Sequence, residues 1–167
     1  LTVISGGAAN NTVVNSSGRL YATSGGTANN TVVNSWGVII VTDGGSANNV
    51  TVCSGGTFTL RSGGQAEDVT LHAAAYLSLE VVPDTYCTGK IAEKSFSMSN
   101  GVLSNCNFYR GLVEIFSGGI AKDTAVFHSG DILINNGASA YDTVIAAGGE
   151  CYVPGGIVDR ITVSSGG

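Results

Sequence analysis

The chain has 167 residues, of which 43% are hydrophobic and only 11% charged, and its formal net charge is −5. An average soluble protein is about 25% charged, so this surface depends on uncharged polar side chains, and no basic cluster is present that could bind nucleic acid. No signal peptide and no apolar run of membrane-spanning length occurs. Because both ends interrupt repetitive sequence, we expect the chain to be an excised piece of a longer protein.

The sequence is built from one repeated phrase. SGGAANNTVVNS at 5–16 returns as SGGTANNTVVNS at 24–35, nineteen residues later. The same frame continues as SANNVTV (46–52), QAEDVTL (65–71), IAKDTAV (120–126), SAYDTVI (139–145) and IVDRITV (157–163). A fixed period of about twenty residues is typical of a solenoid.

After each of these segments, apolar and polar residues alternate, which predicts a second strand with one buried face. The first inward column is Leu1, Leu20, Ile39, Phe58, Leu77, Phe96, Val113, Ile132 and Cys151. The second is Val3, Ala22, Val41, Leu60, Leu79, Met98, Ile115, Ile134 and Val153. Gly-Gly pairs between the strands exclude a helix and permit sharp corners with positive φ.

The sequence therefore predicts an all-β fold, a single-stranded parallel β-helix of about nine coils with a repeat of ~19 residues. We expect one solenoid over 1–167, with regular repeats at 1–79 and 111–167 and divergent coils at 80–110.

Stacked coils place asparagines in two adjacent columns. The first contains Asn10, Asn29 and Asn48, and the second contains Asn11, Asn30 and Asn49. Amide side chains in register can hydrogen-bond along such a column. Two interpretations are open: the ladders satisfy polar groups at a corner, or they form a polar stripe through which two rods associate. Later coils have Asp68, Asp123, Asp142 and Arg160 in the second column, which predicts solvated surface.

The unit SGG-x-A-N-N-T-V-V-N-S-x-G-R-L-Y resembles the repeats of AIDA-type self-associating autotransporter adhesins. The resemblance is close over 1–79 and good over 111–167, and 88–119 is similar to a divergent coil of the same passenger. It implies a right-handed β-helical passenger that is secreted, lies outside a Gram-negative cell, and promotes self-association, cell aggregation or biofilm formation. It also implies an outer-membrane barrel elsewhere in the parent chain.

By the same analogy, passenger serines at the Gly-Gly corners are candidates for O-glycosylation with heptose. They are Ser5, Ser24, Ser62 and Ser117. The four cysteines depart from the family's usual scarcity. Cys87 and Cys106 lie nineteen residues apart, which suits a disulfide between neighbouring coils. A two-residue deletion near Asn100 shifts their frames, so a bridge and free thiols both remain open.

Some parallel β-helices are polysaccharide-degrading enzymes, which need clustered carboxylates. The repeat frame predicts that the acidic residues are scattered among different columns, namely Glu80, Asp84, Glu93, Glu114, Asp131 and Glu150. Lys122 and Asp123, adjacent in sequence, are expected on opposite faces of a strand. His72 and His128 are expected in well-separated coils as structural polar residues. We predict no catalytic residue, metal ion or cofactor.

These observations favour a non-enzymatic rod whose partner is a second copy of itself, not a nucleic acid. The alternatives are a rod that binds a glycan or a host-receptor or cell-surface protein, and a passive stalk that projects another domain. A glycan-binding rod should group its exposed aromatic residues on one side. The candidates are Tyr21, Tyr76, Tyr109, Tyr141 and Tyr152, and Trp36 is expected to be exposed at a corner.

Overall fold

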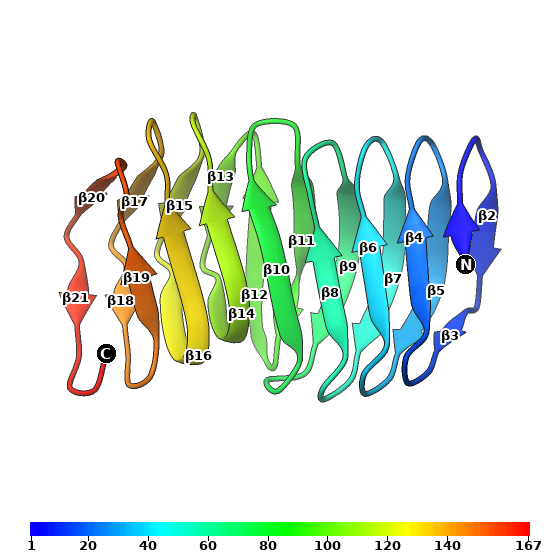
Figure 1. Ribbon diagram of the computed structural model, residues 1–167, viewed down its shortest axis with the longest axis horizontal. Helices are drawn as coiled ribbons and strands as arrows, with labels where there is room; N and C mark the ends of the chain where they lie inside the picture. The colour runs from blue at the N-terminus through cyan, green and yellow to red at the C-terminus, as the bar shows by residue number, and fades with distance from the viewer.

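The computed structural model describes residues 1–167, which form strands, turns and connecting segments. Figure 1 shows the coils side by side from the N-terminus at the right to the C-terminus at the left, as a flattened rod. The front strands run upward, the chain crosses to the rear at the top, and successive coils advance to the left, which is a right-handed path. No helix with the length and hydrophobicity of a membrane span is present.

Two sheets form the walls of the rod, the first with ten strands and the second with eleven. The first contains β1 (Thr2–Val3), β4 (Arg19–Ala22), β6 (Val38–Val41), β8 (Thr57–Leu60), β10 (Tyr76–Val81), β14 (Asn107–Ile115), β16 (Ala125–Ile134), β18 (Val144–Ile145), β19 (Glu150–Tyr152) and β21 (Thr162–Val163). The second contains β2 (Ala8–Asn10), β3 (Val13–Val14), β5 (Thr27–Val33), β7 (Ser46–Val52), β9 (Gln65–Leu71), β11 (Tyr86–Ile91), β12 (Lys94–Ser99), β13 (Val102–Ser104), β15 (Ile120–Lys122), β17 (Ser139–Tyr141) and β20 (Ile157–Asp159).

The strands pair in parallel with their repeat equivalents. Leu20 lies opposite Ile39, and Ile39 lies opposite Phe58, so residues nineteen apart stack along the rod. The predicted all-β parallel solenoid of about nine coils is therefore confirmed.

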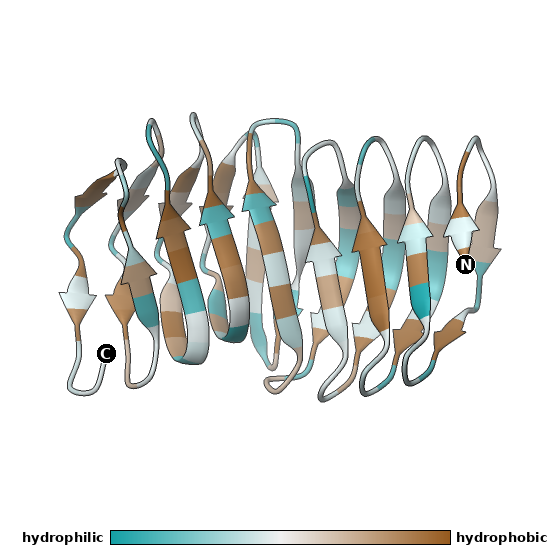
Figure 2. Cartoon of the chain, in the orientation of Figure 1, coloured by the Kyte–Doolittle hydropathy of each residue, from teal (hydrophilic) through white to brown (hydrophobic).

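The inward columns form one hydrophobic core of 37 buried residues. In Figure 2, brown hydrophobic segments are concentrated in the strands, whereas the turns at the two edges are mostly pale or teal. Apart from the divergent stretch described below, the columns fail at the ends of the rod. Leu1 is 69% exposed and Val153 is 42% exposed, because a terminal coil has a neighbour on one side only.

The two glycines of the Gly25–Gly26 corner have different roles. Gly25 has φ +79°, a left-handed conformation that glycine adopts without a steric penalty. A Cβ on Gly26 would lie 2.0 Å from the carbonyl oxygen of Val3 on the preceding coil. The first glycine therefore permits the turn, and the second permits close contact between coils.

The divergent stretch is the main departure from the repeat. β12 pairs antiparallel with both β11 and β13, so three strands form a meander in the second sheet. In the first sheet, β10 then pairs directly with β14, with Leu79 opposite Val113. Phe96 and Met98 are buried, but in the second sheet. The predicted positions of Phe96 between Leu77 and Val113, and of Met98 between Leu79 and Ile115, are therefore wrong. The alternation did not reveal the error, because an antiparallel strand buries alternate residues as a parallel strand does.

The sequence carries a signal for this meander. Asn100 and Gly101 have φ 50° and 75°, and Asn-Gly with two positive φ values is the preferred two-residue hairpin turn. Its spacing resembled a shortened repeat loop, which masked the hairpin.

Thr31 is a buried polar side chain whose Oγ1 has no hydrogen-bond partner. Valine takes the paired position in the next two coils, as Val50 and Val69. We expect Thr31→Val to raise the free energy of unfolding by about 1 kcal/mol, because it removes an unpaired hydroxyl and keeps the side-chain shape.

Thr124 provides the matched control. It is equally buried, but its Oγ1 donates to the carbonyl oxygen of Lys122 at 3.2 Å. Thr124→Val should therefore lower stability by about 1 kcal/mol. Thermal unfolding of both variants measures the difference, and a destabilised Thr31→Val protein would contradict this interpretation.

Candidate functional site

The two asparagine columns lie on β2, β5 and β7 and the corners beside them. In the first column, Asn29 Nδ2 donates to Asn10 Oδ1 at 2.8 Å, and Asn48 Nδ2 donates to Asn29 Oδ1 at 3.1 Å. The second column repeats this arrangement, with distances of 3.2 and 2.8 Å between Asn11, Asn30 and Asn49. A further amide pair, Asn34 to Asn15 at 2.8 Å, lies at another corner and was not expected from the sequence.

The second column also has a backbone requirement. Asn11, Asn30 and Asn49 have φ values of 53°, 50° and 54°, in a left-handed region where asparagine and aspartate are strongly enriched. The same conformation continues at Asp68, Asn105, Asp123, Asp142 and Arg160. Conformation at this corner therefore explains why asparagine and aspartate interchange there. Most residues of this column are asparagine or aspartate, and that restriction was the sequence signal for a left-handed backbone at this corner.

The ladders leave hydrogen-bonding groups unused. An asparagine amide has two N–H donors and an oxygen with two lone pairs, and an interior ladder position uses one donor and one lone pair. Asn30 and Asn49 are exposed, so their remaining groups face solvent. Beside them on the outer face of the second sheet, Val13, which is 56% exposed, lies opposite Val32. We call Asn10, Asn11, Asn29, Asn30, Asn48 and Asn49, with Val13 and Val32, the amide face.

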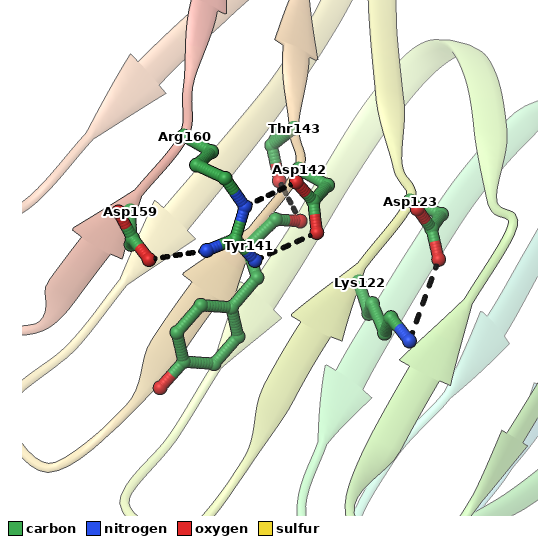
Figure 3. A network of polar contacts seen from close by, with 7 residues as sticks. All are labelled: Lys122, Asp123, Tyr141, Asp142, Thr143, Asp159 and Arg160. Carbon is green, nitrogen blue, oxygen red and sulfur yellow. Dashed lines mark hydrogen bonds and ion pairs between the residues drawn. The ribbon is translucent and has the colours of Figure 1, made fainter.

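Charged side chains replace the amides towards the C-terminal end (Figure 3). Arg160 donates to both carboxylate oxygens of Asp142, at 2.6 and 2.9 Å, and to Asp159 at 2.7 Å. Lys122 forms an ion pair with Asp123 at 3.9 Å. The expectation that Lys122 and Asp123 face opposite ways is wrong, because the left-handed corner at Asp123 interrupts the alternation of the strand.

The ion pair between Arg160 and Asp142 predicts a dependence of stability on pH. Hydrogen bonds from Arg160 hold the pKa of the Asp142 carboxyl below its ordinary value. The stabilisation is present above the unfolded-state pKa of about 3.9 and is lost as the pH falls through the lower folded-state pKa. We expect Arg160→Gln to raise the pKa of Asp142, measured by NMR titration of its carboxyl carbon. An unchanged pKa would show that Arg160 does not stabilise the carboxylate.

Acidic residues are less scattered than the repeat frame predicts. Glu80 lies opposite Glu114, and Asp131 lies opposite Glu150, on neighbouring coils of the first sheet. The prediction of separate columns is wrong for these two pairs. Burial, and secondly the charge of Glu150, raise the pKa of Asp131. Arg61 lies 3.7 Å from Glu80 and compensates part of its charge.

The aromatic candidates do not form one row. Tyr76 contacts Arg110, which follows Tyr109 in β14. At the lower edge of the rod in Figure 1, β14 and β16 round the corner as continuous strands. Tyr109 lines an open hollow together with His72, Arg110 and His128. The expectation that the two histidines are well separated is wrong, because the meander removes a coil from the first sheet between them. Trp36 is 70% exposed at a corner, as expected.

No disulfide bond joins the four cysteines in the structure. Cys87 and Cys106 are both fully buried in the core. Burial raises the pKa of the Cys106 thiol to about 12, and burial together with the neighbouring Cys106 raises the pKa of the Cys87 thiol still further. Such thiols are protonated and inert at neutral pH. A Cys87–Cys106 bridge stays a prediction.

The serines proposed for glycosylation lie exposed along one edge of the rod. The backbone N–H of Ser5 donates to the carbonyl oxygen of Ser24 at 2.8 Å, so these two corners stack directly. Ser62 differs from the others because its hydroxyl donates to the Asp84 carboxylate at 3.0 Å.

Residues 3–52 match the family model described as the AIDA adhesin of the bacterial autotransporter system, probable stalk. Comparison with curated proteins gives no match. Among solved structures, the chain is similar to a fragment of TibA that was hyper-glycosylated by TibC. The identity is 19% and the TM-score 0.45, with 100% of this chain and 89% of that chain covered.

Proposed function

We propose, because residues 3–52 match the family model of the AIDA autotransporter adhesins, that the chain is part of a cell-surface adhesin passenger whose rods associate side by side. The passenger would be secreted and displayed outside the bacterial cell, where contact between rods on different cells leads to aggregation and biofilm formation. No catalytic step is needed for this function.

The amide face is the observation that supports this proposal. Its unused N–H groups and lone pairs recur once per coil, so a second rod laid alongside meets the same spacing of about 4.8 Å. Each hydrogen bond contributes only about 0.5–1.5 kcal/mol net, but contacts on one rigid rod form together and their effects combine.

Low charge supports the same face. Arg19 and Asp43 are the only ionic side chains before Arg61. Two copies of this part of the rod therefore approach with little like-charge repulsion, which elsewhere disfavours association.

The triple replacement of Asn11, Asn30 and Asn49 by aspartate tests the amide face. Aspartate suits the left-handed corner, as Asp68 demonstrates. Three stacked carboxylates at neutral pH would repel those of a second rod, so we expect the association constant to fall at least ~10-fold. Sedimentation velocity over a concentration series measures this change.

The matched control replaces Asn15 and Asn34 by aspartate. These residues form an amide pair at a different corner, so the change adds charge outside the amide face. Equal loss of association in both variants would mean that net charge, and not the ladder, controls association. Unchanged association of the triple variant would remove the amide face from the mechanism.

A second candidate function is a passive stalk, which is favoured by the words "probable stalk" in the description of the matching family model. A stalk would remain monomeric in the same sedimentation experiments, with and without the three substitutions. O-glycosylation at Ser5, Ser24, Ser62 and Ser117 belongs to the adhesin proposal by analogy, and mass spectrometry of the protein purified from its own cells tests it.

A further inference from the structure

The hollow at the lower edge exists because one coil has a shorter corner than its neighbours. In β14, only 109–112 separate the inward residues Phe108 and Val113. In the preceding coil, the turn at 72–75 and Tyr76 separate Leu71 from Leu77. The corner of β14 therefore lies closer to the core than the 72–75 turn of the preceding coil and the 127–130 corner of the following coil. The resulting hollow has a volume of about 590 Å³.

One wall of the hollow is a flat aromatic surface. The Tyr109 ring stacks on Phe127 of the following coil, with centroids 5.0 Å apart and an interplanar angle of 19°. The other face of Tyr109 is turned towards the preceding coil, where Ala73 and Ala74 line the hollow with small side chains. Because the side chains opposite the ring face are small, a flat ligand ring has space to stack on Tyr109.

The other wall carries hydrogen-bond donors and a positive charge. The Arg110 guanidinium carbon lies 5.1 Å from the centroid of the Tyr76 ring, a cation–π contact that fixes the orientation of the side chain. His72, His128 and Ser129 add groups that can bond hydroxyls. No carboxylate lines the hollow, although the net charge of the chain is −5.

We propose that this hollow binds an acidic saccharide, a pyranose that carries a carboxylate. The C–H face of the sugar packs on the free face of Tyr109, because ring C–H groups are apolar and fit an aromatic surface. The carboxylate pairs with Arg110, whose planar guanidinium can form two parallel hydrogen bonds with it. The imidazoles and Ser129 bond the sugar hydroxyls.

The site is independent of the amide face, since it uses other coils and another edge of the rod. A hollow on the side of a rod, open to solvent, also lets a polysaccharide chain continue past the bound residue. The adhesin could then attach to a glycan and to a second copy of itself at the same time.

Isothermal titration of the full chain with D-glucuronic acid, N-acetylneuraminic acid, D-glucose and acetate tests the proposal. We expect at least one of the two acidic sugars to bind ~10-fold more tightly than both glucose and acetate, because only an acidic sugar uses both walls. Preference for N-acetylneuraminic acid indicates a host glycan, and preference for glucuronic acid indicates a polysaccharide. Either result supports the site.

Arg110→Gln should weaken binding of the acidic sugar ~10-fold and leave glucose unchanged. Arg19→Gln is the matched control, because Arg19 also lies beside a tyrosine, with Nη1 3.5 Å from the Tyr21 hydroxyl, but outside the hollow. Equal affinity for acetate and the sugars, equal loss in both arginine variants, or no binding of any acidic sugar would overturn the proposal.

Discussion

Replacing Gly111 by alanine is expected to lower the free energy of unfolding by at least ~3 kcal/mol. Gly111 has φ +106°, and a Cβ there would lie 1.9 Å from the carbonyl oxygen of Leu77 on the preceding coil. The substitution therefore combines an unfavourable backbone conformation with a clash against backbone atoms, which cannot rotate away. Because β10 and β14 meet at this residue, the change should separate the two halves of the first sheet.

Gly6→Ala is the control for the conformational part of this effect. Gly6 has a similarly positive φ of +77°, but a Cβ there has nothing within 4 Å. We expect a loss of about 1 kcal/mol. Urea denaturation of both variants measures the difference, and equal shifts would show that the coils do not approach each other at Gly111 as closely as described.

Phe58→Ala is expected to destabilise the protein by about 3–5 kcal/mol, because it leaves a large cavity in the middle of the core. Phe58 is fully buried and lies between Ile39 and Leu77 on the neighbouring coils. Val153→Ala is the comparison, with an expected change of about 0.5 kcal/mol or less, since Val153 is 42% exposed.

The repeat frame assigns Phe58 and Val153 to equivalent inward columns, so only the structure predicts this difference. Urea denaturation of the two variants measures it. Similar losses would contradict the exposed position of Val153 at the end of the rod.

Most of the fold follows from the sequence because a solenoid is periodic. Once Leu20, Ile39 and Phe58 are aligned, sheet register and core composition are determined together, since each coil must stack on the one before it. The frame fails where periodicity ends. Leu1 is exposed at the end of the described rod, and Phe96 lies in the second sheet because a hairpin preserves the same alternation of buried residues.

The two surfaces differ in how far they could be predicted. The ladder at Asn10 and Asn29 was predictable, since in-register stacking brings identical side chains together. The hollow was not, because it depends on the direct pairing of β10 with β14. That pairing brings His72 and Arg110 to the same edge, and no spacing in the sequence indicates it before the meander at 86–104 is recognised.

The amide face and the hollow both consist of side chains that the stacked coils hold in fixed positions. Hydrogen bonds to neighbouring coils hold every asparagine of the two ladders, and Asn29 and Asn30 are held on both sides. Little side-chain entropy therefore remains to be lost when a second rod binds. The corner of β14 is held in the same way, by Gly111 against Leu77 on one side and by Tyr109 against Phe127 on the other.

Sedimentation velocity of a chain with blocked ends tests the central claim, that rods associate through their sides, most directly. Exposed edge strands can pair artificially end to end, so lysine is introduced at Thr2 in β1 and at Thr162 in β21 to prevent stacking of coils. We predict that the blocked chain still forms larger species as its concentration rises, at low and at high salt. A single monomeric species at every concentration would contradict side-to-side self-association and favour a stalk.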